Sequence, residues 1–460
     1  MTVTVDNVYL LSSSLLASVS LGILIWAFRR LLKASSAPTE PRKVKQSPDS
    51  EDGEWKPVSF TYPEVTPFPG DIASTKPIPY RPFKWGEYHV TMGIRSMPWD
   101  DWIELDCQFE HYSKIRERRI KDRGDHVLCT LPATPGKVAA AEPAARELLY
   151  ELAEYLSRRY PNVYKVTRHS PSEKSVYGWY DLGDIKDITI VPMQKTFNLA
   201  EGDPMVLAAL LTQDDLAIMI EGSDGKYYLQ GGAILNAGTW RLEDKLGMPL
   251  DEIHISGGVP RFKSKLDLSM GRFFKRLPVD KPVIRNNYSF QVVNPKTVSE
   301  MDPSELAWSN TMKGNEDLVE EGVRWLRDIN GNMQKVEVEG EKKKHAGYGG
   351  ADLKASGVEV TPETVWMRTE RQTLRRLPKT GAIIFTIRVY QTPIVDLVKE
   401  PGVPGRLASA IKSWPDDVAE YKAKYAFEGI LGFLEACHEQ QVEQGVLSRD
   451  EPKSNAAYPY

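Results

Sequence analysis

The sequence predicts an α+β domain with a mainly antiparallel sheet and flanking helices. Between Ile383 and Tyr390, apolar residues alternate with other side chains at a period of two, which is typical of a strand with one apolar face. The arginine-rich run Arg368 to Arg376 precedes this strand, and Pro378 and Gly381 between them supply turn chemistry. We therefore expect a hairpin. Hairpins interspersed with helices favour this class over the βαβ alternation of a Rossmann domain, and no GxGxxG motif occurs.

Further strands are expected in the middle of the chain. The apolar runs Leu216 to Ile220 and Tyr227 to Leu235 are separated by a short polar segment. Because this segment contains Asp224-Gly225, a hairpin turn signal, the two runs are expected to pair. Val283 to Val293 is interpreted as another strand.

The clearest helix spans Glu142 to Tyr160, where leucine and tyrosine side chains recur at spacings of three and four. Pro143 fits its first turn, and Pro161 ends it. Trp99 to Trp102 is expected to open a second helix, and the charged run Lys114 to Arg123 is interpreted as a solvated helical face.

Several shorter helices are also expected. Thr239 is placed to cap a helix that ends at Gly247, and Pro249 starts another short turn. Leu318 to Leu326 has an amphipathic helical pattern. Asp416 to Glu443 is expected to form either two terminal helices or one long helix.

The N-terminal region predicts a membrane anchor. Val8 to Phe28 carries no charged side chain and is long enough to cross a bilayer as a helix. Arg29, Arg30 and Lys33 follow it, so the positive-inside rule places the rest of the chain in the cytosol, on the endoplasmic reticulum or another endomembrane. A cleaved signal peptide would need a basic start and a shorter apolar core.

We divide the chain into four parts. Residues 1–33 are the expected anchor and 34–56 a flexible linker rich in serine, proline and charged residues. Residues 57–400 form the main domain, with an inserted segment at 300–362, and 401–460 form a helical extension and tail.

Composition narrows the class of function. The net charge of −4 gives no electrostatic case for a nucleic-acid partner. The three cysteines, Cys107, Cys129 and Cys437, form no CxxC pair and fit neither an iron–sulfur site nor a disulfide framework. They are typical of a reducing compartment.

The arginine-rich strand is the first candidate for a binding site. Arginines held against a core are costly unless they meet an anion, so such a strand could grip the carboxylates of a buried cofactor. The alternative is a solvated edge strand with surface arginines. The charged residues concerned are Arg368, Glu370, Arg371, Arg375 and Arg376.

His254 is the sharpest single candidate. Leu250, Ile253 and His254 fall at spacings that place the imidazole on an apolar helical face. Such a histidine can donate one ring nitrogen to a carbonyl and ligate iron with the other in a dry pocket. Gly257 and Gly258 follow, which allows the backbone to approach a flat ligand. The alternative is a core histidine with satisfied hydrogen bonds.

A polar cluster, Arg285 to Tyr288, interrupts the strand that begins at Val283. Asparagine is unfavourable in strands, so these residues suggest hydrogen bonds into a cavity or, alternatively, an exposed edge. Motifs of other enzyme classes are missing from the sequence: it has neither the HExxH of a zinc site nor the GxSxG of a serine hydrolase.

Taken together, several segments resemble one family. The chain is similar to the α subunit of haem-dependent oxidative N-demethylase, in its fungal membrane-tethered branch, over roughly Pro79 to Pro393 without the inserted segment. The segments that carry the resemblance are Pro79 to Asp106, the helix LLYELAEYLSRRYP, Leu211 to Met219, Thr239 to Pro260, RNNY and RTERQTLRRLP.

The resemblance implies a PAS-like antiparallel sheet that carries one b-type haem. It implies a monooxygenase reaction in which oxygen removes a methyl group from a small secondary amine, with electrons from a separate flavin and iron–sulfur protein. His254 would be the axial ligand of the haem iron. Arg371, Arg375 and Arg376 would hold the haem propionates or polarise bound oxygen, and Glu370 would orient an arginine.

The resemblance also suggests a polar distal wall for handling oxygen. Arg371 and Tyr288 are the residues expected to act there, and Arg285 is expected to bind the cofactor. One alternative is a haem-binding sensor or carrier without turnover, because PAS-like folds often sense gas or redox state. A lumenal glycosyltransferase ranks last, since no DxD metal motif occurs and the basic residues follow the anchor.

Overall fold

The structure is a computed structural model that describes residues 53–172, 175–236, 240–292, 322–327, 333–338, 359–422, 424–449 and 453–460. Its main feature is a seven-stranded antiparallel sheet in the order β1-β8-β11-β12-β6-β7-β2, which confirms the expected fold class. The strands are β1 (Arg95–Ser96), β2 (Leu128–Thr130), β6 (Asp215–Glu221), β7 (Tyr227–Ala233), β8 (Val283–Val292), β11 (Val365–Arg376) and β12 (Ile383–Pro393).

Both expected hairpins are confirmed. Strand β11 pairs along its length with β12, with Thr373 opposite Thr386, and Gly381 adopts φ +70° in the turn between them. Positive φ is costly for residues with a Cβ, so glycine suits this position. Strands β6 and β7 pair antiparallel through the turn that contains Asp224-Gly225.

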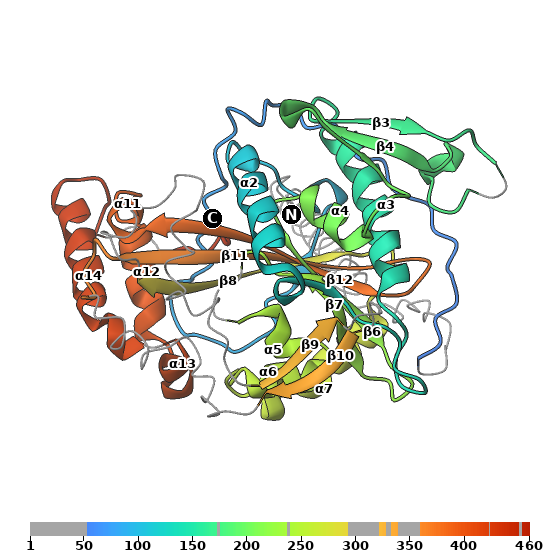
Figure 1. Cartoon of the computed structure of the whole chain (residues 1–460). Helices are drawn as coiled ribbons and strands as arrows, with labels where there is room; N and C mark the ends of the chain where they lie inside the picture. The colour runs from blue at the N-terminus through green and yellow to red at the C-terminus, as the bar shows by residue number, and fades with distance from the viewer. Residues whose placement is uncertain are drawn as a thin grey trace, which may run out of the picture. The chain divides into compact units, whose positions relative to one another are not determined.

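Helices cover both faces of the sheet (Figure 1). Helices α2, α3 and α4 lie over one face together with a small three-stranded sheet, whereas α5, α6 and α7 lie over the other. The first layer contains α2 (Phe109–Arg123), α3 (Glu142–Arg159), α4 (Pro204–Leu210), β3 (Tyr164–Arg168), β4 (Ile185–Ile190) and β5 (Lys195–Asn198). The second contains α5 (Leu242–Lys245), α6 (Leu250–Ser256), a π-helical turn (Phe262–Leu266) and α7 (Asp267–Arg276).

Strand periodicity divides the apolar side chains between these two layers. On β6, Leu216 and Ile218 belong to the core that contains α3. The alternate residues Ala217 and Met219 belong to the core that contains α7. Because successive side chains point to opposite faces of a sheet, one strand contributes to both cores.

The helix predictions are confirmed in part. Helix α3 matches the expected helix closely, but Trp99 to Trp102 forms only a single 3₁₀ turn, and the α-helix begins at Phe109. The solvated face expected from Lys114 to Arg123 is wrong for Arg116, which is buried and pairs with Asp215 at 3.0 Å. Its charge made it look solvated, but a buried carboxylate on β6 compensates it.

The C-terminal helices form at one end of the sheet (Figure 1). They are α11 (Ile394–Leu397), α12 (Val403–Lys412), α13 (Asp416–Tyr421) and α14 (Glu428–Glu443), so the last segment is divided between two helices rather than forming one. The helix expected at Leu318 to Leu326 is wrong from Gly322 onward, because β9 (Gly322–Arg327) pairs there with β10 (Met333–Val338). Cross-strand pairing outweighs the local helical spacing.

Some expectations fall on residues outside the described ranges. The anchor at Val8 to Phe28, most of the linker and of the inserted segment, and the cap at Thr239 are among them. Helix α5 instead has Arg241 at its N-cap. In the part of the chain that the structure describes, no helix has the length and apolar character needed to cross a membrane.

Arg371, Arg375 and Arg388 of the central strands are buried in ion pairs on the α2–α3 side of the sheet, so the solvated edge strand is wrong. Strand β11 lies between β8 and β12, and Arg371 pairs with Glu104 at 2.9 Å. Buried charges are tolerated when such partners compensate them. Three more pairs join the same layer: Arg375 with Glu151, Arg388 with Asp106, and Arg116 with Asp215.

One acidic residue in this layer lacks such compensation. The carboxylate of Asp214 is fully buried and makes no hydrogen bond to any residue that the structure describes. Burial raises the pKa of Asp214 to about 7, against the favourable charges of Arg388 and Arg371. The folded protein therefore holds this proton well above the pH at which the unfolded chain releases it.

The raised pKa of Asp214 predicts a pH dependence of stability. The free energy of unfolding should fall as pH rises from about 4 to 7, because the unfolded chain ionises Asp214 while the folded chain does not; the loss is at most about 1.4 kcal/mol for each pH unit in this range. We expect Asp214→Asn to remove this dependence and to exceed the wild type in stability by up to a few kcal/mol at pH 8. Urea unfolding at several pH values measures the pH dependence of the free energy of unfolding, and Asp280→Asn at an exposed position serves as the control. A stability difference that does not change with pH would contradict the assignment.

Candidate functional site

A cavity of about 360 Å³ lies between the sheet and helices α5 to α7. This volume falls within the range of roughly 300–1,000 Å³ that small-molecule sites occupy. The lining is mainly apolar, as in sites that bury a large ligand surface. Its larger apolar side chains include Met92, Met219, Leu229, Met270, Phe274 and Phe385.

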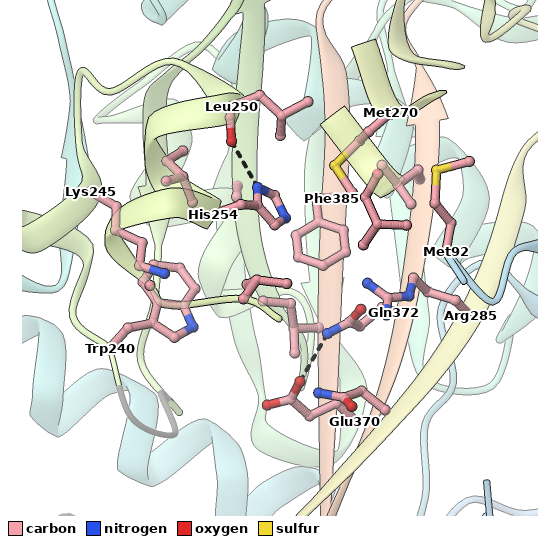
Figure 2. Close-up of a pocket in the computed structure, with 18 of the residues that line it drawn as sticks. Met92, Trp240, Lys245, Leu250, His254, Met270, Arg285, Glu370, Gln372 and Phe385 are labelled. Carbon is pink, nitrogen blue, oxygen red and sulfur yellow. Dashed lines mark hydrogen bonds between the residues drawn. The ribbon is translucent and has the colours of Figure 1, made fainter. Parts of the chain in front are cut away.

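His254 on α6 points into this cavity (Figure 2). Its Nδ1 lies 2.7 Å from the carbonyl oxygen of Leu250, one helical turn earlier. Because a carbonyl can only accept, Nδ1 carries the proton and donates it, and Nε2 keeps a free lone pair. Phe262 packs flat against the imidazole with ring centroids 4.8 Å apart. The orientation of the ring is thus fixed from two sides.

The protonation state of His254 suits a metal ligand. Burial lowers the pKa of His254 to about 4, so the ring is neutral at physiological pH. Among the described residues, a hydrogen-bond partner is found for Nδ1 of this ring and not for Nε2. Nε2 is therefore the atom that is available to a ligand in the cavity.

Local sequence signals set the start and the end of α6. Pro249 precedes its first turn, and the backbone N–H of Val259 donates to the carbonyl of His254 at 3.0 Å after the helix has ended. Gly258 adopts φ +66° in the reversal, a conformation that disfavours residues with a Cβ. These features were visible in the sequence as Pro249 and the Gly257-Gly258 pair.

The strands supply a polar patch on the cavity lining. Glu370 and Gln372 of β11 face the cavity beside their cross-strand neighbours on β8, Asn287 and Arg285. The Gln372 side chain donates to Glu370 Oε2 at 2.8 Å, and Arg368 Nε donates to Oε1 at 3.1 Å. Figure 2 shows Glu370 on the far side of the cavity from His254. The carboxylate is thus held in place by two neighbours on its own strand.

Two lysines also belong to the charged lining, and neither was expected there from the sequence. Lys245 on α5 lies over the ring of Trp240 at 4.9 Å, and burial lowers its pKa. Lys422, which follows α13, donates to the carbonyl of Tyr288 at 2.6 Å, and burial lowers its pKa to about 8. Lys245 lies inside a segment that carries the family resemblance. Lys422 comes from the C-terminal extension and could only be found from the tertiary structure.

The structure places two expected cofactor-binding arginines on the opposite face of the sheet. Arg371 pairs with Glu104, and Arg375 pairs with Glu151 beneath the rings of Trp99 and Trp102. They alternate along β11 with Glu370 and Gln372, which do face the cavity. The expected arginine wall opposite His254 is therefore corrected: of the expected arginines, only Arg285 lines this cavity.

Arg376 and Tyr288 also lie outside the cavity lining. Arg376 donates to the carbonyls of Leu277 and Gly381 at 2.7 and 2.9 Å and to Phe274, which ties the end of β11 to the end of α7. The Tyr288 ring packs between Phe83 and Trp414. Both residues therefore support the elements around the site instead of facing its interior.

The arrangement is suited to a large, flat, mainly apolar group with acidic side arms. His254 offers one axial nitrogen, the apolar lining covers the faces of the group, and Arg285, Lys245 and Lys422 are cations at the same cavity. No set of three or more His, Cys, Asp or Glu side chains within the described ranges could hold a metal ion unaided. A porphyrin supplies four nitrogen ligands itself and needs only an axial protein ligand.

Comparison with known protein families agrees with this geometry. The family model described as haem-dependent oxidative N-demethylase, alpha subunit-like, matches residues 93–431. The match covers well over half of the chain and includes His254, the strands that line the cavity, and Lys422.

The low pKa of His254 has a measurable consequence. In the ligand-free protein, the free energy of unfolding should fall as pH decreases from 6.5 towards 4, because the unfolded chain protonates this imidazole and the folded chain does not. The loss should be at most about 1.4 kcal/mol for each pH unit in this range. We expect His254→Gln to lose less stability over this range, and the exposed His169→Gln to behave as wild type. An NMR titration of His254 with a midpoint near pH 6.5 would contradict the lowered pKa.

Proposed function

Because the chain belongs to the family of haem-dependent oxidative N-demethylase alpha subunit-like proteins, we propose that it is a haem-dependent oxidoreductase that demethylates a small amine with oxygen as the oxidant. One observation carries the proposal. The neutral imidazole of His254 presents Nε2 to a mainly apolar cavity while Nδ1 is held by Leu250. This is the arrangement that an axial haem ligand needs, since the bonded nitrogen fixes the tautomer and the other binds iron.

The residues at the cavity define how a b-type haem would be held. His254 would ligate the iron, and the methionine and phenylalanine side chains would cover the macrocycle. Arg285, Lys245 and Lys422 would receive the propionates, in place of the arginines of β11 that face away. Charge-assisted hydrogen bonds of this kind are worth roughly 1.5–3 kcal/mol each.

The bound haem would supply the oxygen chemistry. The protein would supply orientation and charge. The carboxyl oxygens of Glu370 accept hydrogen bonds from Arg368 and Gln372, which fix its orientation, so Glu370 could hold the ammonium group of an amine substrate at the cavity. The mainly apolar lining would lower the local dielectric constant and so strengthen this contact.

Electrons would come from a separate flavin and iron–sulfur protein. Cys107 is exposed, Cys129 is buried and Cys437 is partly exposed. Their separation in the sequence gives no four-cysteine motif for a cluster of the chain's own.

We further propose that the chain is held at an endomembrane by Val8 to Phe28, with the domain in the cytosol, as in a fungal membrane-tethered branch of the family. No nucleic-acid partner is proposed.

A non-catalytic haem sensor or carrier with a PAS-like fold is the second candidate, because both functions would use the same axial histidine. Absorption spectroscopy of the purified protein tests haem binding. We expect a Soret band in the wild type and in His169→Ala, and its loss in His254→Ala. Substrate-dependent oxygen consumption in the presence of a reductase would favour the enzyme. Wild-type protein that stays colourless with added haem would exclude both candidates.

The two faces of the sheet predict different effects for different arginines. Arg285→Met should weaken haem binding by roughly tenfold or more, because a propionate loses a charged partner. Arg375→Met should keep the haem affinity but lower the free energy of unfolding by roughly 3–5 kcal/mol, since Glu151 is left buried without its cationic partner. Haem titration and urea unfolding of both variants measure this. Loss of haem from Arg375→Met at unchanged stability would return that arginine to the haem site.

A further inference from the structure

A basic surface covers the outside of the helices that carry the cavity. Between α6 and the end of α7, the exposed side chains include five cations, although the whole chain has a net charge of −4. This basic surface comprises Lys263, Lys265, Arg272, Lys275 and Arg276. Such a concentration of one charge sign creates a local positive potential.

An apolar side chain is exposed within the basic surface. Leu268 on α7 is 75 % exposed. Leu268, Arg272 and Lys275 recur at spacings of four and three on α7, so they share its outer face. A small apolar centre with a charged surround is the usual composition of a transient protein interface.

The inner side of the same elements lines the cavity. Leu266, Met270, Phe273 and Phe274 face the proposed haem, and His254 is carried by the preceding helix. The basic surface is therefore separated from the cavity by one helix layer, about 10 Å thick. An electron carrier docked on it would come close to the cofactor without entering the cavity.

We propose that the basic surface is the docking site of an acidic electron-donor protein. The proposal rests on the proposed function and adds the place and charge of the partner. In each encounter the donor, a reduced flavin or iron–sulfur protein, loses one electron and the bound haem iron gains it. Opposite charges would orient the donor and speed its association, as in other electrostatically steered complexes.

The same observations weigh against a membrane as the occupant of this surface. A helix that lies on a bilayer directs its broad apolar face into the lipid. The apolar face of α7 is instead buried against the cavity, and Leu268 is the large hydrophobic side chain that this helix exposes most. Charge on the outer face therefore fits an acidic protein better than lipid.

Electron transfer to the haem-loaded, full-length protein tests the proposal. Reduced flavodoxin serves as the acidic protein donor and photoreduced riboflavin as the small neutral donor. The variant Lys263→Glu/Lys265→Glu/Arg272→Glu reverses the basic surface. Its control, Lys114→Glu/Lys121→Glu/Lys186→Glu, changes the same number of exposed cations on the opposite layer.

At low ionic strength, we expect the first variant to be reduced by flavodoxin roughly tenfold or more slowly than wild type. Reduction by riboflavin and the behaviour of the control should be unchanged, and the difference should shrink in about 0.5 M salt as charges are screened. Equal flavodoxin rates in wild type and variant, or no reduction of wild type by flavodoxin, would overturn the docking site.

Three outcomes separate the possible failures. Binding to phosphatidylserine vesicles that is lost in the reversed variant, with unchanged flavodoxin rates, would show a membrane surface instead. Protein that takes up no haem would overturn the proposed function and this inference with it. Haem-loaded protein that fails only the flavodoxin comparison would leave the proposed function intact.

Discussion

The fold and the site both depend on the alternation of side chains along β11. Its neighbours β8 and β12 fix the register, so Glu370 and Gln372 face the cavity while Arg371 and Arg375 face the α2–α3 layer. A shift of one residue would exchange these two sets. The guanidinium groups would then enter a mainly apolar cavity, and Glu104 and Glu151 would lose their arginine partners. The register is therefore coupled to the chemistry of both faces.

Burying these ion pairs costs desolvation free energy, but breaking them by a shift in register would cost more. Removing one partner of a buried pair leaves an uncompensated charge and costs roughly 3–5 kcal/mol. A shifted register would break at least the pairs of Arg371 and Arg375 at once, which approaches the total stability of a typical domain. These arginines thus specify the position of the strand, and in this way they serve the cavity without touching its contents.

The cavity itself combines short-range and long-range structure. His254 is oriented by Leu250 within a single helical turn, and Phe262 completes its support from the next segment. The polar groups that lie across the cavity from His254 come from β8 and β11, which follow it in the sequence. Lys422 comes from the C-terminal extension. The chain belongs to the haem-dependent oxidative N-demethylase alpha subunit-like family, and the matched residues include His254, the strands at the cavity and Lys422.

The sequence alone determined the antiparallel hairpins and the long helix α3, because periodicity, turn residues and helical spacing are local properties. It also singled out His254, which the structure places at the cavity. It could not decide which face of β11 meets the cavity, since alternation defines two faces without saying what covers each. The arginine motif was therefore recognised but assigned to the wrong face. Tertiary packing decided which face of β11 meets the cavity, and it alone brought Lys422 there. Both depend on contacts between segments that are far apart in the sequence.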